Sequence, residues 1–184
     1  MRTERLASEY ELLQTITFFP LHPETPPDGR PLADLFGDRM DAFEAMSSRL
    51  RHLMEAEGLE YGRRTHTYNS RLAQELGKWA EDQPDGERIH LALYRAYFVD
   101  GINLADVDQL VAIAVSVGLD PVAAGSVLKN RAYRNAVDED WQRAMRLGVT
   151  GVPTYMAGRF RVVGAQPYET LEQLVLHAAQ DASQ

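Results

Sequence analysis

The segment Thr150-Gly151-Val152-Pro153-Thr154 holds the residues best placed to contact a ligand. A bond that precedes proline in a tight loop is the one place where a cis peptide costs little. Thr150 and Gly151 are small and leave the backbone beside Val152 open. The sequence therefore predicts a loop that faces a substrate, with the alternative that Pro153 only sets the start of the following strand.

Reactive side chains are few. The chain contains no cysteine, which excludes disulfides, zinc-thiolate sites and thiol nucleophiles within its 184 residues. The five histidines form no pair spaced four residues apart, so neither a metal nor a cofactor is expected. His22 lies in a proline-rich loop and is either a base or polar residue of a cleft, or a residue that packs the loop. The acidic cluster Asp138-Glu139-Asp140 is interpreted as a solvated helix face.

Two further groups are candidates for ligand contact. Gln166 begins the last predicted helix, where its amide and the first N–H groups of the helix could bind a carboxylate. An apolar groove for a peptide or an aromatic ligand could be formed by Tyr94, Tyr97 and Phe98, together with Trp79 and the region from Met46 to Met54. Their helical spacing favours core packing instead.

Charge and hydrophobicity disfavour two classes of function, nucleic-acid binding and membrane insertion. Twenty-seven acidic against 19 basic residues give a net charge of -8, which disfavours binding to nucleic acid. No apolar stretch approaches the roughly 20 residues that span a bilayer, and the N-terminus lacks a signal-peptide apolar region. We therefore expect a soluble, cytoplasmic protein that binds neither nucleic acid nor membrane.

Hydrophobic spacing predicts the elements that position these residues. A helix over residues 2–13 precedes a β-prone strand over residues 14–21. A hairpin follows much later, over residues 154–157 and 160–163. Between them the sequence predicts helices over 39–57, after a cap at Asn69 or Ser70, over 87–100, over 106–117 and over 130–147. A short helix is predicted to begin at Pro121 with Asp120 as its cap, and Pro167 opens the last helix.

The chain resembles the DsbA superfamily, particularly its FrnE-like branch, through stretches that are weak singly but specific in their order. They are residues 19–26 (FPLHPETP), 69–73 (NSRLA), 95–101 (RAYFVDG), 118–120 (GLD), 150–154 (TGVPT) and 164–166 (GAQ). The resemblance implies an α/β, thioredoxin-like (DsbA-type) domain with a helical insertion, apparently without the first β-strand. It implies a thioredoxin-like part at 1–30 and 148–184 and a helical insertion at 31–147.

The function that the resemblance implies is thiol-disulfide oxidation or reduction, in which the backbone before Pro153 pairs with an extended peptide or a small thiol. The family's Cys-Pro-x-Cys motif would lie just before Met1. Either Met1 is internal to a longer reading frame, or this member has lost the motif. The residues as given are then inactive in redox chemistry, and the alternative is a cysteine-free module that binds a peptide or thiol.

A weaker alternative is a glutathione-dependent isomerase or transferase, of the chromene-carboxylate isomerase or kappa-class type. Those families typically carry Ser-Asp where this chain has Ala165-Gln166, which disfavours that branch. The missing first strand would also leave backbone amides that a second copy of the chain could pair. We therefore predict a homodimer.

Overall fold

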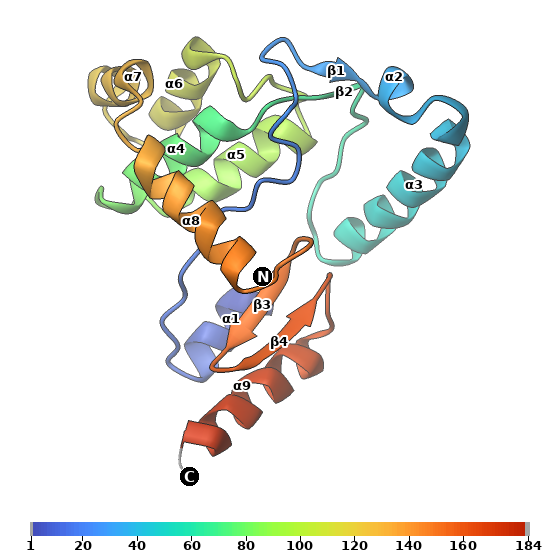
Figure 1. The fold of residues 1–184 in the computed structure, drawn as a ribbon, viewed down its shortest axis with the longest axis vertical. Helices are drawn as coiled ribbons and strands as arrows, with labels where there is room; N and C mark the ends of the chain where they lie inside the picture. Colours follow the sequence, from blue (N-terminus) through green and yellow to red (C-terminus); the bar gives the residue numbers. More distant parts are fainter. Residues whose placement is uncertain (1, 183–184) are drawn as a thin grey trace. The chain divides into compact units, whose positions relative to one another are not determined.

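The computed structural model describes residues 2–182, which divide into two compact units (Figure 1). Unit 1 comprises residues 1–21 and 140–184, and unit 2 comprises residues 22–139. The boundaries expected from the sequence were residues 30 and 148. The chain is mostly helical, with two small antiparallel sheets.

Unit 1 is built around a hairpin. Strands β3 (Thr154–Ala157) and β4 (Phe160–Val163) have the bounds expected from the sequence and pair with Thr154 opposite Val163. Helix α9 (Tyr168–Ala182) packs against both strands, and α1 (Arg2–Glu9) packs against α9. Leu6, Leu171 and Leu174 are buried in this unit.

Polar contacts also tie α1 to α9. The Tyr168 hydroxyl donates a hydrogen bond to the Glu9 carboxylate, and Arg5 Nε donates to the same carboxylate at 2.8 Å. The Arg5 guanidinium lies 4.0 Å from the centroid of the Tyr168 ring. The hydrogen bond to Glu9 raises the pKa of Tyr168 to about 12. The bonds from Tyr168 and Arg5 lower the pKa of Glu9.

The strand predicted over residues 14–21 is wrong, because residues 12–20 have no regular secondary structure. A β-branched and aromatic run becomes a strand only where a neighbouring strand completes the ladder. Here the Phe18 N–H donates to the Asp140 carboxylate at 2.9 Å, so a side chain takes the place of a ladder acceptor. The helix predicted over 2–13 ends at Glu9, close to Glu11, which has a φ of 51°.

Unit 2 is a group of helices with a two-stranded sheet of two residues per strand. Its elements are β1 (Arg30–Pro31), α2 (Leu32–Phe36), the 3₁₀ helix η1 (Gly37–Arg39), α3 (Met40–Ala56), β2 (His66–Thr67), α4 (Arg71–Glu81), α5 (Arg88–Phe98), α6 (Val107–Ser116) and α7 (Pro121–Asn130). Helix α8 (Arg134–Arg146) begins in unit 2 and ends in unit 1. The sheet and α2 were not expected from the sequence.

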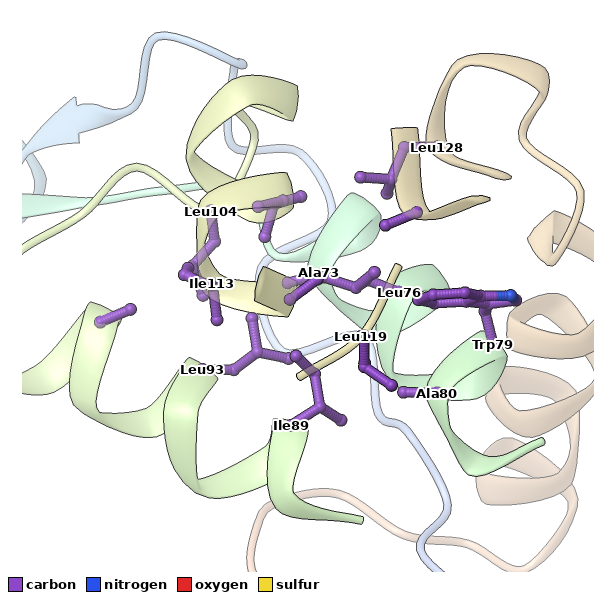
Figure 2. Close-up of a cluster of buried hydrophobic side chains, with 14 residues drawn as sticks. Ala73, Leu76, Trp79, Ala80, Ile89, Leu93, Leu104, Ile113, Leu119 and Leu128 are labelled. Atoms are coloured by element: carbon purple, nitrogen blue, oxygen red, sulfur yellow. The ribbon is translucent and has the colours of Figure 1, made fainter. Parts of the chain in front are cut away.

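The core of unit 2 lies among α4, α5, α6 and α7 (Figure 2). Leu76, Ile89 and Leu110 are completely buried there. Two aspartates begin helices around this core: Asp106 accepts from the N–H groups of Asp108 and Gln109, and Asp120 accepts from that of Ala123. The predicted cap at Asp120, followed by proline in the first turn, is confirmed.

A buried carboxylate lies beside this core. Glu75 on α4 is fully buried and accepts hydrogen bonds from Arg71 and Arg131. Burial raises the pKa of Glu75, but the bonds from the two guanidiniums outweigh burial, so the net pKa is lowered. Within residues 2–182, no helix is both long and apolar enough to cross a bilayer.

Candidate functional site

The loop that precedes β3 is held on one side by the hairpin. The Pro153 carbonyl accepts a hydrogen bond from the Gly164 N–H at 2.8 Å, which extends the β3–β4 pairing by one step. The Thr154 hydroxyl donates to the Gly151 carbonyl at 2.7 Å. The Val152–Pro153 peptide bond is cis. Residues 151–154 are therefore fixed as a tight turn.

Arg161 holds the other side of the loop. Its guanidinium donates to the carbonyl groups of Leu147 and Gly148, at 2.9 and 3.2 Å, where α8 has just ended. Carbonyl groups at the C-terminal end of a helix lack partners within the helix and carry its negative partial charge, so a cation stabilises them. Gly148, with a φ of 64°, supplies the left-handed conformation that ends α8. One side chain of β4 thus fixes the start of the loop.

Val152 lies in the loop between these two supports. Its side chain is 50% exposed. Neither its N–H nor its C=O has a hydrogen-bond partner among the described residues. A Cβ atom added at Gly151 would meet no atom within 4 Å. The turn therefore offers a free donor and a free acceptor, with open space beside Gly151. The binding role of Thr150, Gly151, Val152 and Pro153 stays a prediction.

Gln166 is engaged within unit 1. Its side-chain amide donates to the Val163 carbonyl at 2.6 Å, and its main-chain carbonyl accepts from Arg2 at 2.6 Å. In this arrangement the amide supports the end of β4. Its role as a carboxylate ligand stays a prediction.

His22 belongs to unit 2, whereas the Val152–Pro153 turn belongs to unit 1. Its side chain is 49% exposed, and Nδ1 lies 3.7 Å from a Glu24 carboxylate oxygen. The role of His22 as a base or cleft residue stays a prediction. Among the described residues, no three histidine or acidic side chains are grouped closely enough to hold a metal ion.

The aromatic candidates divide between the core and a stacked group. Trp79 is part of the core of unit 2. Phe98 contacts the Tyr94 ring with centroids 5.1 Å apart and meets the Tyr97 ring edge-on at 4.8 Å. The Arg64 guanidinium lies over Tyr97 and Phe98, at 4.8 and 5.0 Å from the ring centroids. These three rings are thus half-buried and packed on one another, with a cation over two of them.

Sequence reasoning missed the residues that contact others only through the tertiary fold. Nothing in the pattern around Arg161 signals that it reaches back to residues 147–148. Arg51, Arg63 and Arg64 escaped notice for the same reason, although they line one pocket of unit 2. The one local signal is the Arg63-Arg64 pair itself, because cations often stack on aromatic rings; the rings that Arg64 covers, Tyr97 and Phe98, lie more than 30 positions away.

Comparisons with known proteins agree on the fold. A family model described as the DSBA-like thioredoxin domain matches residues 3–176. A crystal structure of a probable DsbA oxidoreductase from Streptomyces coelicolor aligns with a TM-score of 0.87 and 28% identity, covering 97% of this chain and 82% of that one. The thioredoxin-like fold expected from the sequence is thereby confirmed.

Two further proteins are similar to this chain. A 2-hydroxychromene-2-carboxylate isomerase aligns with a TM-score of 0.76 at 20% identity, over 99% of this chain and 89% of that one, which shows a shared fold alone. The protein YwbO of Bacillus subtilis is 28% identical over 111 residues. That match spans 60% of this chain and 55% of the relative, a little over half of the relative's length.

Proposed function

Because this chain belongs to the DSBA-like thioredoxin domain family, we propose that its Val152–Pro153 turn binds an extended peptide or a small thiol. One observation carries the proposal: the N–H and C=O groups of Val152 have no partner among the described residues. A main chain with a free donor and a free acceptor recognises another main chain by strand addition. Two such hydrogen bonds contribute about 1–3 kcal/mol in total.

The open space beside Gly151 supports the same proposal, because an approaching chain needs room as well as partners. The supports at Gly164 and Arg161 keep the turn in place before the ligand arrives. A turn that is already ordered loses little conformational freedom on binding.

Disulfide exchange itself needs a thiolate that attacks a disulfide sulfur and displaces a second thiolate. None of the 184 residues is a cysteine. The proposed role of these residues in a DsbA-type oxidoreductase is therefore to hold the substrate. The related fold of 2-hydroxychromene-2-carboxylate isomerase raises a glutathione-dependent isomerase as the alternative. The bond between the Gln166 amide and Val163 counts against that alternative, because it engages one of the two N–H groups that could bind the carboxylate of glutathione.

Nuclear magnetic resonance can test the proposal directly, by monitoring the backbone amide of Val152. The ¹⁵N-labelled protein is titrated with reduced glutathione, and separately with an unstructured peptide that carries S-methylcysteine and cannot exchange disulfides. We expect the amide signal of Val152 to shift with at least one ligand, and Gly151→Val, which fills the open space, to weaken that ligand about tenfold. A shift with glutathione alone favours the isomerase or transferase branch.

The matched control is Gly125→Ala on α7, whose added Cβ would meet no atom closer than 3.7 Å. This variant should bind like the original chain. If neither ligand moves the Val152 signal at millimolar concentration, or if Gly151→Val and Gly125→Ala bind alike, the turn is not the binding site.

A further inference from the structure

Unit 2 contains an open pocket of about 620 Å³ between α3 and the segment that leads into β2. One wall is a single face of α3, with Met40, Phe43, Ser47 and Arg51 spaced three or four residues apart. The opposite wall is the segment 61–65. Every lining residue belongs to unit 2, whereas the Val152–Pro153 turn belongs to unit 1.

The segment opposite α3 is firmly held. The Gly62 N–H donates to the Phe98 carbonyl at 2.8 Å, and a Cβ atom at Gly62 would lie 2.5 Å from the Val99 carbonyl oxygen. The Leu32 N–H donates to the Thr65 carbonyl at 2.9 Å, and β1 pairs with β2 immediately afterwards. The backbone that presents the side chains of residues 61–65 is thus fixed at both ends.

Three guanidiniums line the pocket against one carboxylate. Arg63 Nη2 lies 3.7 Å from Glu44 Oε1, but both side chains are exposed, at 84% and 60%, so this ion pair neutralises little of the charge. The guanidinium of Arg51, on α3, has no hydrogen bond or ion pair with any described residue. The pocket is therefore positive in a chain whose net charge is -8.

The guanidinium of Arg64 is partly buried and has no anionic partner among the described residues. Nη1 donates to the neutral Tyr97 hydroxyl at 2.7 Å, and the guanidinium covers the rings of Tyr97 and Phe98. Nε is buried and has no hydrogen-bond partner among the described residues. Burying a charge without a counter-charge is costly, and a bound anion would reduce that cost.

Both walls of the pocket also carry apolar and aromatic side chains. Phe43 stacks on Phe36 with ring centroids 4.5 Å apart, and Tyr61 stacks on Phe98 at 5.8 Å. Met40 and Leu32 complete this surface. Pockets that bind small molecules typically combine such an apolar lining with a few polar groups that fix orientation.

We propose that this pocket binds a small organic anion, in which a carboxylate or phosphate group meets Arg51, Arg63 and Arg64 and a flat apolar body packs on Phe43 and Tyr61. Guanidiniums bind both anionic groups with paired hydrogen bonds. The anionic group of the ligand is then either a carboxylate or a phosphate ester, and the experiment distinguishes between the two.

The probes are naphthoate, naphthyl phosphate and the neutral naphthamide, each titrated into the full chain by calorimetry. We expect at least one anion to bind with a dissociation constant of about 1 mM or tighter and naphthamide to bind at least tenfold more weakly. Whichever anion binds more tightly identifies the anionic group. Failure of both anions to bind at several millimolar, or equal binding of naphthamide, would overturn the proposal.

Two arginines on the same helix provide a matched pair of variants. Arg51→Gln removes an unpaired cation that lines the pocket, and Arg49→Gln removes the same charge from an exposed position outside it. We expect Arg51→Gln to weaken the anion about tenfold and Arg49→Gln to change its affinity less than twofold. Glu44→Gln should strengthen binding about two- to threefold, because it removes a repulsive charge. Equal losses in the two arginine variants would show that net charge, and not this pocket, attracts the anion.

Discussion

Arg131 binds the carboxylate of Glu75 with both sides of its guanidinium: Nε lies 2.8 Å from Oε2 and Nη2 lies 2.7 Å from Oε1. Arg71 Nε adds a third bond, to Oε1 at 2.8 Å. Glu75 is fully buried on α4, whereas Arg131 follows α7 and has a left-handed φ of 54°. This ion pair fixes the end of α7 against α4.

Replacing the buried carboxylate should destabilise unit 2. Glu75→Gln keeps the shape of the side chain but removes the counter-charge of Arg131 and one of the two carboxylates that bind Arg71, the other being Asp138. We therefore expect a loss of about 3 kcal/mol in the free energy of unfolding. Urea unfolding followed by circular dichroism measures it. Arg134→Gln is the control, because Arg134 and Asp138 form an exposed pair at 3.9 Å, and it should change stability by less than about 0.5 kcal/mol. Equal losses in the two variants would contradict the assigned role of Glu75.

The same carboxylate makes stability depend on pH. The pKa of Glu75 is lowered in the folded chain from its ordinary value of 4.5. Its contribution is therefore fully present above pH 4.5 and is lost as pH falls through the folded value. The difference in unfolding free energy between the original chain and Glu75→Gln should stay constant above pH 4.5 and shrink below it. A difference that grows on acidification would mean that the folded pKa is raised.

Glycine is required at one position in the wall of the anion pocket. In Gly62→Ala, the added Cβ would lie 2.5 Å from the Val99 carbonyl oxygen, and backbone must shift to relieve the clash. We expect a loss of about 1–3 kcal/mol in thermal or urea unfolding. Gly125→Ala lies within α7 with no atom closer than 3.7 Å, and should instead stabilise the chain by about 0.5–1 kcal/mol. The two Gly→Ala substitutions should thus change the free energy of unfolding in opposite directions. A stabilising Gly62→Ala would contradict the close contact between Gly62 and the Val99 carbonyl.

The contact between Tyr168 and Glu9 can be followed by absorbance. Tyrosinate absorbs in the near ultraviolet, so Tyr168→Phe should remove a titration with a midpoint of about 12, and Glu9→Gln should move that midpoint toward 10. Because the folded pKa is raised, the stabilisation by this bond is fully present below pH 10 and is lost as pH rises through about 12. An unchanged midpoint in Glu9→Gln would show that Glu9 is not the cause.

The homodimer stays a prediction. The argument for it, that backbone amides need a partner from a second copy, is weakened by one contact within the chain. Residues 16–18 were expected to be a strand with unpaired amides, but the Phe18 N–H is bound by Asp140 within the same chain. Size-exclusion chromatography with light scattering gives the mass directly. A dimer would have twice the chain mass of 20.7 kDa, and a mass near 20.7 kDa at all concentrations would exclude it.

Sequence reasoning located most helices and the hairpin, because their signals are local. The turn residues Ala157-Gly158-Arg159, with β-prone residues on either side, predicted the bounds of both strands. Asp120-Pro121 predicted the start of α7. The strand over residues 14–21 failed because a strand depends on a distant partner that local propensity does not supply. The two-residue strands β1 and β2 are too short to give a periodic pattern.

The candidate sites divide in the same way. The turn around Val152 is contiguous in sequence and could be recognised from Thr150 to Thr154. Its support by Arg161 and the pocket between Arg51 and Arg64 each join residues at least 13 positions apart, through backbone contacts such as that of Gly62 with Phe98. No spacing rule for a helix or a strand connects such positions, so only the folded chain brings them together.

Helix α3 has a consequence for local stability. All 17 of its residues are described and none is buried, so little apolar packing opposes its opening. Its amide hydrogens should therefore exchange with solvent faster than those of α4, where seven residues are buried. An anion held between α3 and segment 61–65 would bind only the closed helix and slow that exchange in proportion to its saturation. The rate of amide hydrogen exchange in α3 would thus report how much of the pocket is occupied.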